Sequence, residues 1–123
     1  MKPIVEAIRK EYPVGTMIEL VSMNDVQAPP KGTLGMVKGV DDLGQILMSW
    51  RTGSSLNLII GTDEFKKVIV TKCYGQERVW YDRDKAIDFF CECYCASEGA
   101  EQQRYSKIIK QIEEGLGYCS DEL

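Results

Sequence analysis

Short apolar stretches separated by turn residues at regular intervals are the feature that most constrains this fold. Between Thr16 and about Thr71 five such stretches follow one another, namely TMIELVSM, TLGMVKGV, QILMSW, SSLNLII and KKVIVTK. Turn-forming segments rich in Gly, Pro or Asp separate them, and strands this short and this evenly spaced indicate a strongly bent antiparallel sheet. The pattern predicts a five-stranded, SH3-like small barrel over residues 13–68, with Gly35 and Gly39 at bulges or close backbone approaches.

Helical patterns flank this β-rich segment. Residues 1–12 are predicted as an N-terminal amphipathic helix that ends before Pro13, because the residue before a proline is driven out of the helical region. Residues 69–123 are predicted as a β-hairpin that turns at Tyr74-Gly75-Gln76, followed by two helices, with Asp82 as the N-cap of the first and Ser97 able to cap the second. The last residues, YCSDEL, are expected to form a tail. The fold class is therefore α+β.

The composition excludes several kinds of chemistry. The chain contains no histidine, which removes Ser-His-Asp and Cys-His catalysis and every zinc site that needs an imidazole. The net charge of −4 disfavours a general nucleic-acid-binding surface and suits contact with a basic protein. No segment reaches the length of a membrane span, and the N-terminus has no signal-peptide pattern. We therefore expect a cytoplasmic protein that is not an enzyme and needs no cofactor.

Three of the five cysteines stand at every second position in FFCECYCASEG. On a helix Cys91 and Cys95 share a face and Cys93 points away, so the three thiols cannot converge on one metal ion. Cys91 and Cys95 could form a four-cysteine zinc site only with Cys73 and Cys119. The preferred interpretation is that these cysteines are small apolar core residues, with Cys91 and Cys95 on a packing stripe. A redox role would be tested first at Cys93 with Cys119.

Exposed acids and aromatics are the remaining candidates for a site. Two acidic pairs fall in predicted turns of the barrel, where an ordinary turn role competes with cation binding, acid–base chemistry or partner binding. Trp50 beside Arg51 and Trp80 at the end of the hairpin could each contribute an aromatic patch, and core packing is the alternative for each. The predicted partner-binding residues are Asp41, Asp42, Trp50, Arg51, Asp63, Glu64, Trp80, Glu113 and Glu114.

Several quoted motifs resemble a family catalogued as a domain of unknown function. The motifs are PVGT, MND with APP, GTLGMVKGVDD, W with GSSL, and GTDEF. The family is found in Gram-positive bacteria, their phages and their conjugative elements, and the resemblance implies an SH3-like barrel. Arg51 and Thr52 stand where the family usually has aspartate and asparagine. The second half resembles a helical module that recurs in mobile-element proteins.

These observations favour a non-enzymatic binding protein of a phage or mobile genetic element. The partner expected is a host or defence-system protein, and the most specific form is an anti-CRISPR-like inhibitor that presents an acidic surface to a nucleic-acid-binding effector. Two alternatives stay open. One is a nucleic-acid-binding module that uses Lys38, Lys66 and Lys67, and the other is a zinc-stabilised structural module.

Overall fold

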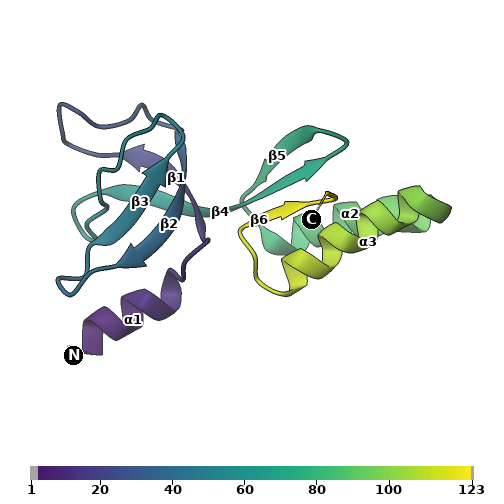
Figure 1. The fold of residues 1–123 in the computed structure, drawn as a ribbon, viewed down its shortest axis with the longest axis horizontal. Helices are drawn as coiled ribbons and strands as arrows, with labels where there is room; N and C mark the ends of the chain where they lie inside the picture. The colour runs from purple at the N-terminus through teal and green to yellow at the C-terminus, as the bar shows by residue number, and fades with distance from the viewer. Residues whose placement is uncertain (1–2, 123) are drawn as a thin grey trace. The chain divides into compact units, whose positions relative to one another are not determined.

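The computed structural model describes residues 3–122 and divides the chain into two compact units, residues 1–67 and 68–123 (Figure 1). Within residues 3–122, three helices and one six-stranded sheet make up the fold, which confirms the α+β class. The strand order is β3-β2-β1-β4-β5, and β6 pairs with β4. Among residues 3–122 no helix is both long and apolar enough to cross a membrane.

The first unit begins with one helix and a three-stranded antiparallel meander. Its elements are α1 (Pro3–Glu11), β1 (Met17–Ser22), β2 (Leu34–Val40) and β3 (Ile46–Trp50). Helix α1 places Val5 in the core, and the guanidinium of Arg9 donates to the Val40 carbonyl oxygen at 3.0 and 3.2 Å. The predicted helix is therefore present, although its first two residues lie outside the described part.

Alternating burial along these strands builds the core of the first unit. In β3, Ile46, Met48 and Trp50 are buried while Ser49 is exposed, which is the period expected when one face of a sheet is covered. The register between β2 and β3 shifts between Val37 and Gly39, as a bulge would produce. The core consists of Val5, Ile18, Leu20, Val37, Val40, Ile46, Met48, Trp50 and Leu58.

The sheet is not closed, so the five-stranded barrel is not confirmed. Within the described part of the chain, the predicted fourth strand, SSLNLII, forms only two isolated bridges, Ile46 with Leu58 and Ile60 with Asp63. Elsewhere its backbone bonds locally: the Leu56 carbonyl accepts from the Trp50 indole at 2.8 Å, and the Ile59 amide donates to Asp63 at 2.8 Å. Backbone groups that would pair in a continuous strand ladder are thus hydrogen-bonded to side chains or within turns.

Strand β4 (Glu64–Cys73) begins in the first unit and continues into the second, where β5 (Gln76–Trp80) pairs with it antiparallel. Tyr74 and Gly75 connect them with φ angles of 52° and 76°. Two successive positive φ angles are typical of the type I′ turn, whose twist matches that of paired strands. The predicted hairpin and the position of its turn are confirmed.

Two helices complete the core of the second unit. Asp82 caps the N-terminus of helix α2 (Arg83–Cys95): its side chain accepts from the amides of Asp84 and Lys85, so the predicted cap is confirmed. Helix α3 (Gly99–Glu113) has no side-chain cap, and the prediction for Ser97 is wrong because its hydroxyl donates to the Tyr94 carbonyl instead. The core consists of Trp80, Ala86, Phe90, Ile108, Ile112 and Cys119.

The predicted tail is also wrong, because it contains a strand. Strand β6 (Tyr118–Ser120) pairs parallel with β4, and Figure 1 shows it beside β4 in the second unit. Gln111 of α3 stabilises it, donating to the Ser120 carbonyl at 2.7 Å and accepting from the Ser120 amide at 2.9 Å. These buried bonds explain why a short polar segment adopts an ordered strand.

Candidate functional site

The structure distributes the cysteines differently from the predicted packing stripe. Cys119 is fully buried and its thiol donates to the Leu116 carbonyl, as a core cysteine would. Cys95 is exposed and Cys91 is half-buried, so the assignment of Cys95 to the core is wrong. Helix α2 instead buries Ala86 and Phe90. Apolar side chains of α2 occupy most of its circumference, so the periodicity of its sequence does not identify the buried face.

The cysteines do not assemble a metal site in the described part of the chain. Among residues 3–122, no three Cys, Asp or Glu side chains are grouped as metal ligands would be. The arrangement of Cys73, Cys91, Cys95 and Cys119 required for a four-cysteine zinc site is therefore not formed. Cys93 and Cys73, from α2 and the end of β4, line one cavity, whereas Cys119 lies in the core.

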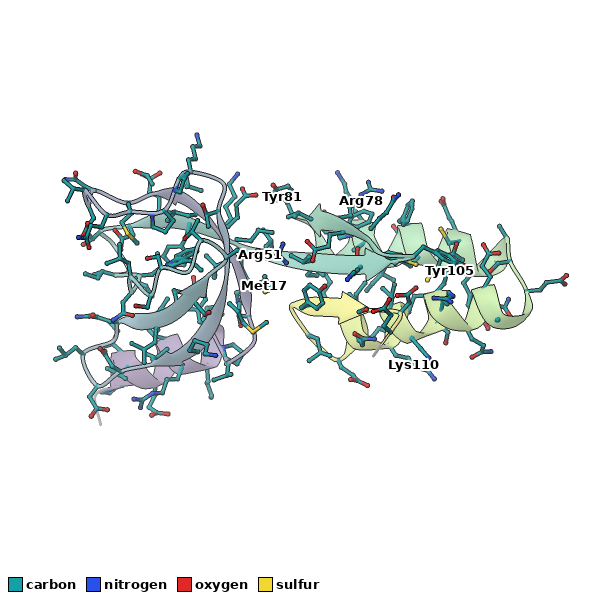
Figure 2. All side chains as sticks on the ribbon, turned by 45° about the horizontal axis from the view of Figure 1, so that its top comes forward. Met17, Arg51, Arg78, Tyr81, Tyr105 and Lys110 are labelled. Carbon is teal, nitrogen blue, oxygen red and sulfur yellow. The ribbon has the colours of Figure 1, made fainter. Side chains whose placement is uncertain are left out.

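That cavity belongs to the second unit. It has a volume of about 320 Å³, is open to solvent, and lies between the hairpin and the two helices. Figure 2 shows two of its lining residues, Arg78 on the hairpin and Tyr105 on α3. The full lining consists of Thr71, Cys73, Gln76, Glu77, Arg78, Phe89, Phe90, Cys93 and Tyr105.

Burial favours the protonated form of two thiols and one phenol at this cavity. Desolvation, with help from the nearby Asp121 carboxylate, raises the pKa of the Cys73 thiol to about 11. The pKa of Cys93 is also raised, first by desolvation and then by Glu92 and Glu101. Desolvation and a hydrogen bond to Glu101 raise the pKa of Tyr105 to about 12. Neutral thiols are poor nucleophiles, so the cavity suits apolar contact better than covalent chemistry.

Arg78 lies at this cavity with its guanidinium over two aromatic rings. The guanidinium carbon is 3.9 Å from the ring centroid of Trp80 and 4.8 Å from that of Phe89. Trp80 is itself anchored, because its indole N–H donates to the Thr71 hydroxyl at 2.9 Å. Stacking of this kind holds a guanidinium in one orientation while its edge stays available for an anion.

The predicted acidic residues of the first unit act mostly within their own turns. The Asp41 carboxylate accepts from the amides of Leu43 and Gln45, and Asp63 accepts from the Ile59 amide. Asp42 forms an ion pair with Arg9 at 3.2 Å. Asp41 and Asp63 therefore have the ordinary structural role of aspartates in turns, which was the alternative to partner binding.

Glu64 lines a second cavity, which belongs entirely to the first unit. Its volume is about 430 Å³, and it is more open than the cavity of the second unit. Tyr12 and Phe65 meet edge to face on one side, with ring centroids 5.6 Å apart. Lys67 lies 5.0 Å from the Tyr12 ring centroid and forms an ion pair with Glu11. The lining consists of Tyr12, Val21, Ile60, Gly61, Asp63, Glu64, Phe65 and Lys66.

Both tryptophans are core residues. Trp50 is 3% exposed and Trp80 is 7% exposed, so neither indole offers a binding surface in this structure. Both tryptophans therefore have the alternative role of core packing rather than forming an aromatic binding patch. Arg51 is exposed in the turn after β3, where its amide donates to the Leu34 carbonyl. Glu113 and Glu114 are exposed at the end of α3.

The sequence interpretation missed a row of carboxylates on α2. Asp84, Asp88 and Glu92 follow one another at intervals of four residues, so they share one helix face, and all three are exposed. Within residues 3–122 none of the three forms an ion pair. The four-residue spacing of the acids in DKAIDFFCE is the sequence signal that identifies this row.

The negative charge is concentrated in the second unit. Residues 1–67 contain eight acidic and eight basic residues, whereas residues 68–123 contain eleven acidic and seven basic ones. The second unit therefore accounts for the whole net charge of −4. Long-range attraction of a basic partner would act mainly on this unit.

No curated protein and no solved structure matches the chain significantly. A family match does exist, and it covers the first unit together with the first residue of the second. The match extends over more than half of the chain. The chain thus belongs to the family described as domain of unknown function (DUF4314), whose sequence profile matches residues 1–68.

Proposed function

We propose that this protein is a non-enzymatic binding protein whose second unit engages a basic surface of a partner protein. The observation that carries the proposal is the row formed by Asp84, Asp88 and Glu92, exposed on one face of α2 in the unit that holds the excess negative charge. Carboxylates four residues apart repel one another and cost helix stability, about 0.2–0.5 kcal/mol per pair. A basic partner would turn this repulsion into attraction.

The absence of enzymatic activity is part of the same proposal. The chain has no histidine, and burial raises the pKa of Cys73, Cys93 and Cys119. A nucleophilic cysteine needs the opposite shift, usually from a nearby cation or a helix N-terminus. These properties support binding rather than covalent catalysis.

The partner we propose is a host or defence-system protein in the cytoplasm, and a nucleic-acid-binding effector is the most specific form. Two considerations support this proposal: the motif resemblance implies relatives in phages and conjugative elements, and an acidic helix can compete with nucleic acid for a basic groove. In this form the protein would be an anti-CRISPR-like inhibitor. The acidic surface proposed is α2 rather than the turns at Asp41 and Asp63, whose side chains bond their own loops.

For the first unit we propose an SH3-like relationship in an opened form. Support comes from the antiparallel meander of β1, β2 and β3 and from the register shift between Val37 and Gly39. Barrels of this size use such shifts to bend their strands. The second unit would be the helical module that resembles segments of mobile-element proteins.

The test compares two variants that remove the same charge. In D84N/D88N/E92Q the α2 row becomes neutral, whereas E64Q/E113Q/E114Q neutralises three other exposed acids. Each protein is immobilised and exposed to a bacterial host lysate at several salt concentrations, and captured proteins are identified by mass spectrometry. We expect the unmodified protein to capture a basic protein in a salt-sensitive manner.

The α2 variant should lose this capture and the matched variant should keep it. Equal capture by all three proteins would overturn the proposed surface, and so would selective loss in the matched variant. Retention of DNA or RNA as the main salt-sensitive ligand would favour the nucleic-acid alternative.

A further inference from the structure

Strand β5 ends the sheet, and one of its edges therefore has no neighbouring strand among the described residues. Cys73 and Gln76 flank the two-residue turn and form the first pair of the β4–β5 ladder. Hydrogen-bonded pairs alternate along an antiparallel ladder from this closing pair. The backbone groups of Arg78 and Trp80 consequently face β4, and those of Val79 face the outer edge.

The cavity of the second unit borders the same strand. Gln76, Glu77 and Arg78 of β5 line it, and the opposite wall comes from α2 through Phe89, Phe90 and Cys93. Phe89 is 39% exposed, so part of this apolar wall is accessible. A chain lying along β5 could therefore place a side chain between the hairpin and α2.

Arg78 supplies a charge that the described residues do not neutralise. Its contacts in the structure are the rings of Trp80 and Phe89, and no carboxylate among residues 3–122 forms an ion pair with it. The neighbouring Glu77 accepts a hydrogen bond from the Tyr118 hydroxyl of β6 at 3.1 Å. A stacked guanidinium binds a carboxylate through two parallel hydrogen bonds, which is one of the stronger polar contacts in proteins.

We propose that the outer edge of β5 and this cavity bind an extended peptide segment in which an apolar residue and an acidic residue stand two positions apart. The peptide backbone adds as a strand to β5, the apolar side chain enters the cavity, and the carboxylate pairs with Arg78. Residues two apart on a strand project from the same face, which is why this spacing fits. This site selects an acidic segment, so it is distinct from the proposed contact of α2 with a basic surface.

A second copy of this chain would oppose like charges in two of its symmetric pairings with this edge. A symmetric antiparallel pairing of two β5 strands centred on Arg78 would place two guanidinium groups opposite each other. Centring the pairing on Glu77 would oppose two carboxylates. Like charges directly opposite across two strands are destabilising, and charged residues on short edge strands protect proteins from such self-pairing.

The direct test is an NMR titration of the ¹⁵N-labelled full chain with the blocked heptapeptide acetyl-TVTLTDT-amide. We expect saturable shifts of the Val79 amide and the Trp80 indole. A peptide with asparagine in place of aspartate should bind roughly tenfold more weakly or worse, since a charge-assisted contact is lost. A peptide with alanine in place of leucine should also bind more weakly. Both comparisons use the unmodified protein, so they do not depend on the folding of a variant.

Two protein variants then locate the contact. Arg78→Gln should weaken binding of the aspartate peptide and leave binding of the asparagine peptide unchanged. Lys72→Gln removes the same charge from the neighbouring strand, at the register position paired with Glu77, and should have little effect. No saturable shift at millimolar peptide would overturn the proposal, as would equal affinity for both peptides or equal losses in the two variants. Concentration-dependent shifts of Val79 without peptide would assign the edge to a second copy instead.

Discussion

Arg104 of α3 donates to the Asp121 carboxylate at 2.9 Å, and this contact connects a helix to the residue that follows β6. The Asp121 side chain is fully buried, and the same oxygen accepts from the Tyr74 amide in the hairpin turn at 3.0 Å. Its other carboxylate oxygen has no hydrogen-bond partner within the described residues. One carboxylate therefore joins the hairpin, α3 and the C-terminal strand.

The first prediction concerns pH. Burial alone would raise the pKa of Asp121, but the Tyr74 amide, the Arg104 guanidinium and the Cys73 thiol outweigh it, and the pKa is lowered. Because its pKa is lower in the folded state, the Asp121 carboxylate stabilises the fold at pH values above 3.8, the pKa of the unfolded state. This stabilisation is lost as the pH falls through the pKa of the folded state. In urea unfolding, Asp121→Asn should be less stable than the unmodified protein at pH 7. The difference should shrink on acidification below about pH 4. A difference independent of pH would contradict this account.

The second prediction uses two glycines of the same strand. A Cβ atom at Gly35 would lie 2.5 Å from Cε3 of Trp50 and 2.9 Å from Cε of Met48. Trp50 cannot easily move, because it is buried and its indole is bonded to Leu56. Gly35→Ala should lower the free energy of unfolding by about 1–3 kcal/mol.

Gly39→Ala is the matched control for that substitution. The nearest atom to a Cβ there is Cδ1 of Leu47 at 3.9 Å, an ordinary contact. This variant should stay within about 1 kcal/mol of the unmodified protein. Chemical denaturation measures both, and equal losses would show that crowding against Trp50 is not the cause.

The third prediction tests the buried hydrogen bond between Trp80 and Thr71. Thr71→Val keeps the size of the side chain but removes the acceptor of the indole N–H. Since both residues are buried, the unpaired donor should cost about 1–3 kcal/mol of stability. Thr52→Val, at an exposed turn position, is the control and should change stability little. The measurement is urea denaturation followed by tryptophan fluorescence.

The fourth prediction ranks the thiols by alkylation rate. Burial raises the pKa of Cys119 to about 11, and that of Cys73 to the same value, against an ordinary value of 9.0. At equal access their thiolate fraction at pH 8 would be roughly 100-fold below that of an unshifted cysteine. Exposed Cys95 should react first with iodoacetamide and Cys119 last. Mass spectrometry of peptides at timed intervals gives the order, and early labelling of Cys119 in the folded protein would refute it.

Local chemistry made part of this fold predictable. The Tyr74-Gly75 turn and the Asp82 cap were readable because each depends on a few adjacent residues. Whether the sheet closes into a barrel could not be predicted from local chemistry. Whether the segment around Leu58 becomes a full strand depends on competing bonds from Trp50 and Asp63, which sequence patterning does not rank.

The acidic character of the candidate site could be predicted from the sequence, but its position in the fold could not. An acidic binding surface was expected, but the turn acids Asp41 and Asp63 turned out to bond their own loops. The cavity beside β5 was not predicted, because it needs β4, α2 and α3 together and so depends on tertiary packing. β6 was missed for the same reason, since Gln111 stabilises it from a distant helix.

The parallel pairing of β6 with β4 has a consequence for the order in which the second unit folds. The β4–β5 hairpin closes through two residues, whereas β6 can pair only after the whole segment from Tyr74 to Gly117 has found its place. Short loops close fast and long-range parallel pairing is slow. We therefore expect the amides of the hairpin to gain protection early in pulse-labelling hydrogen exchange and those of Cys119 and Ser120 to gain it last. On a ribosome, the hairpin could form while its final partner strand is still being synthesised.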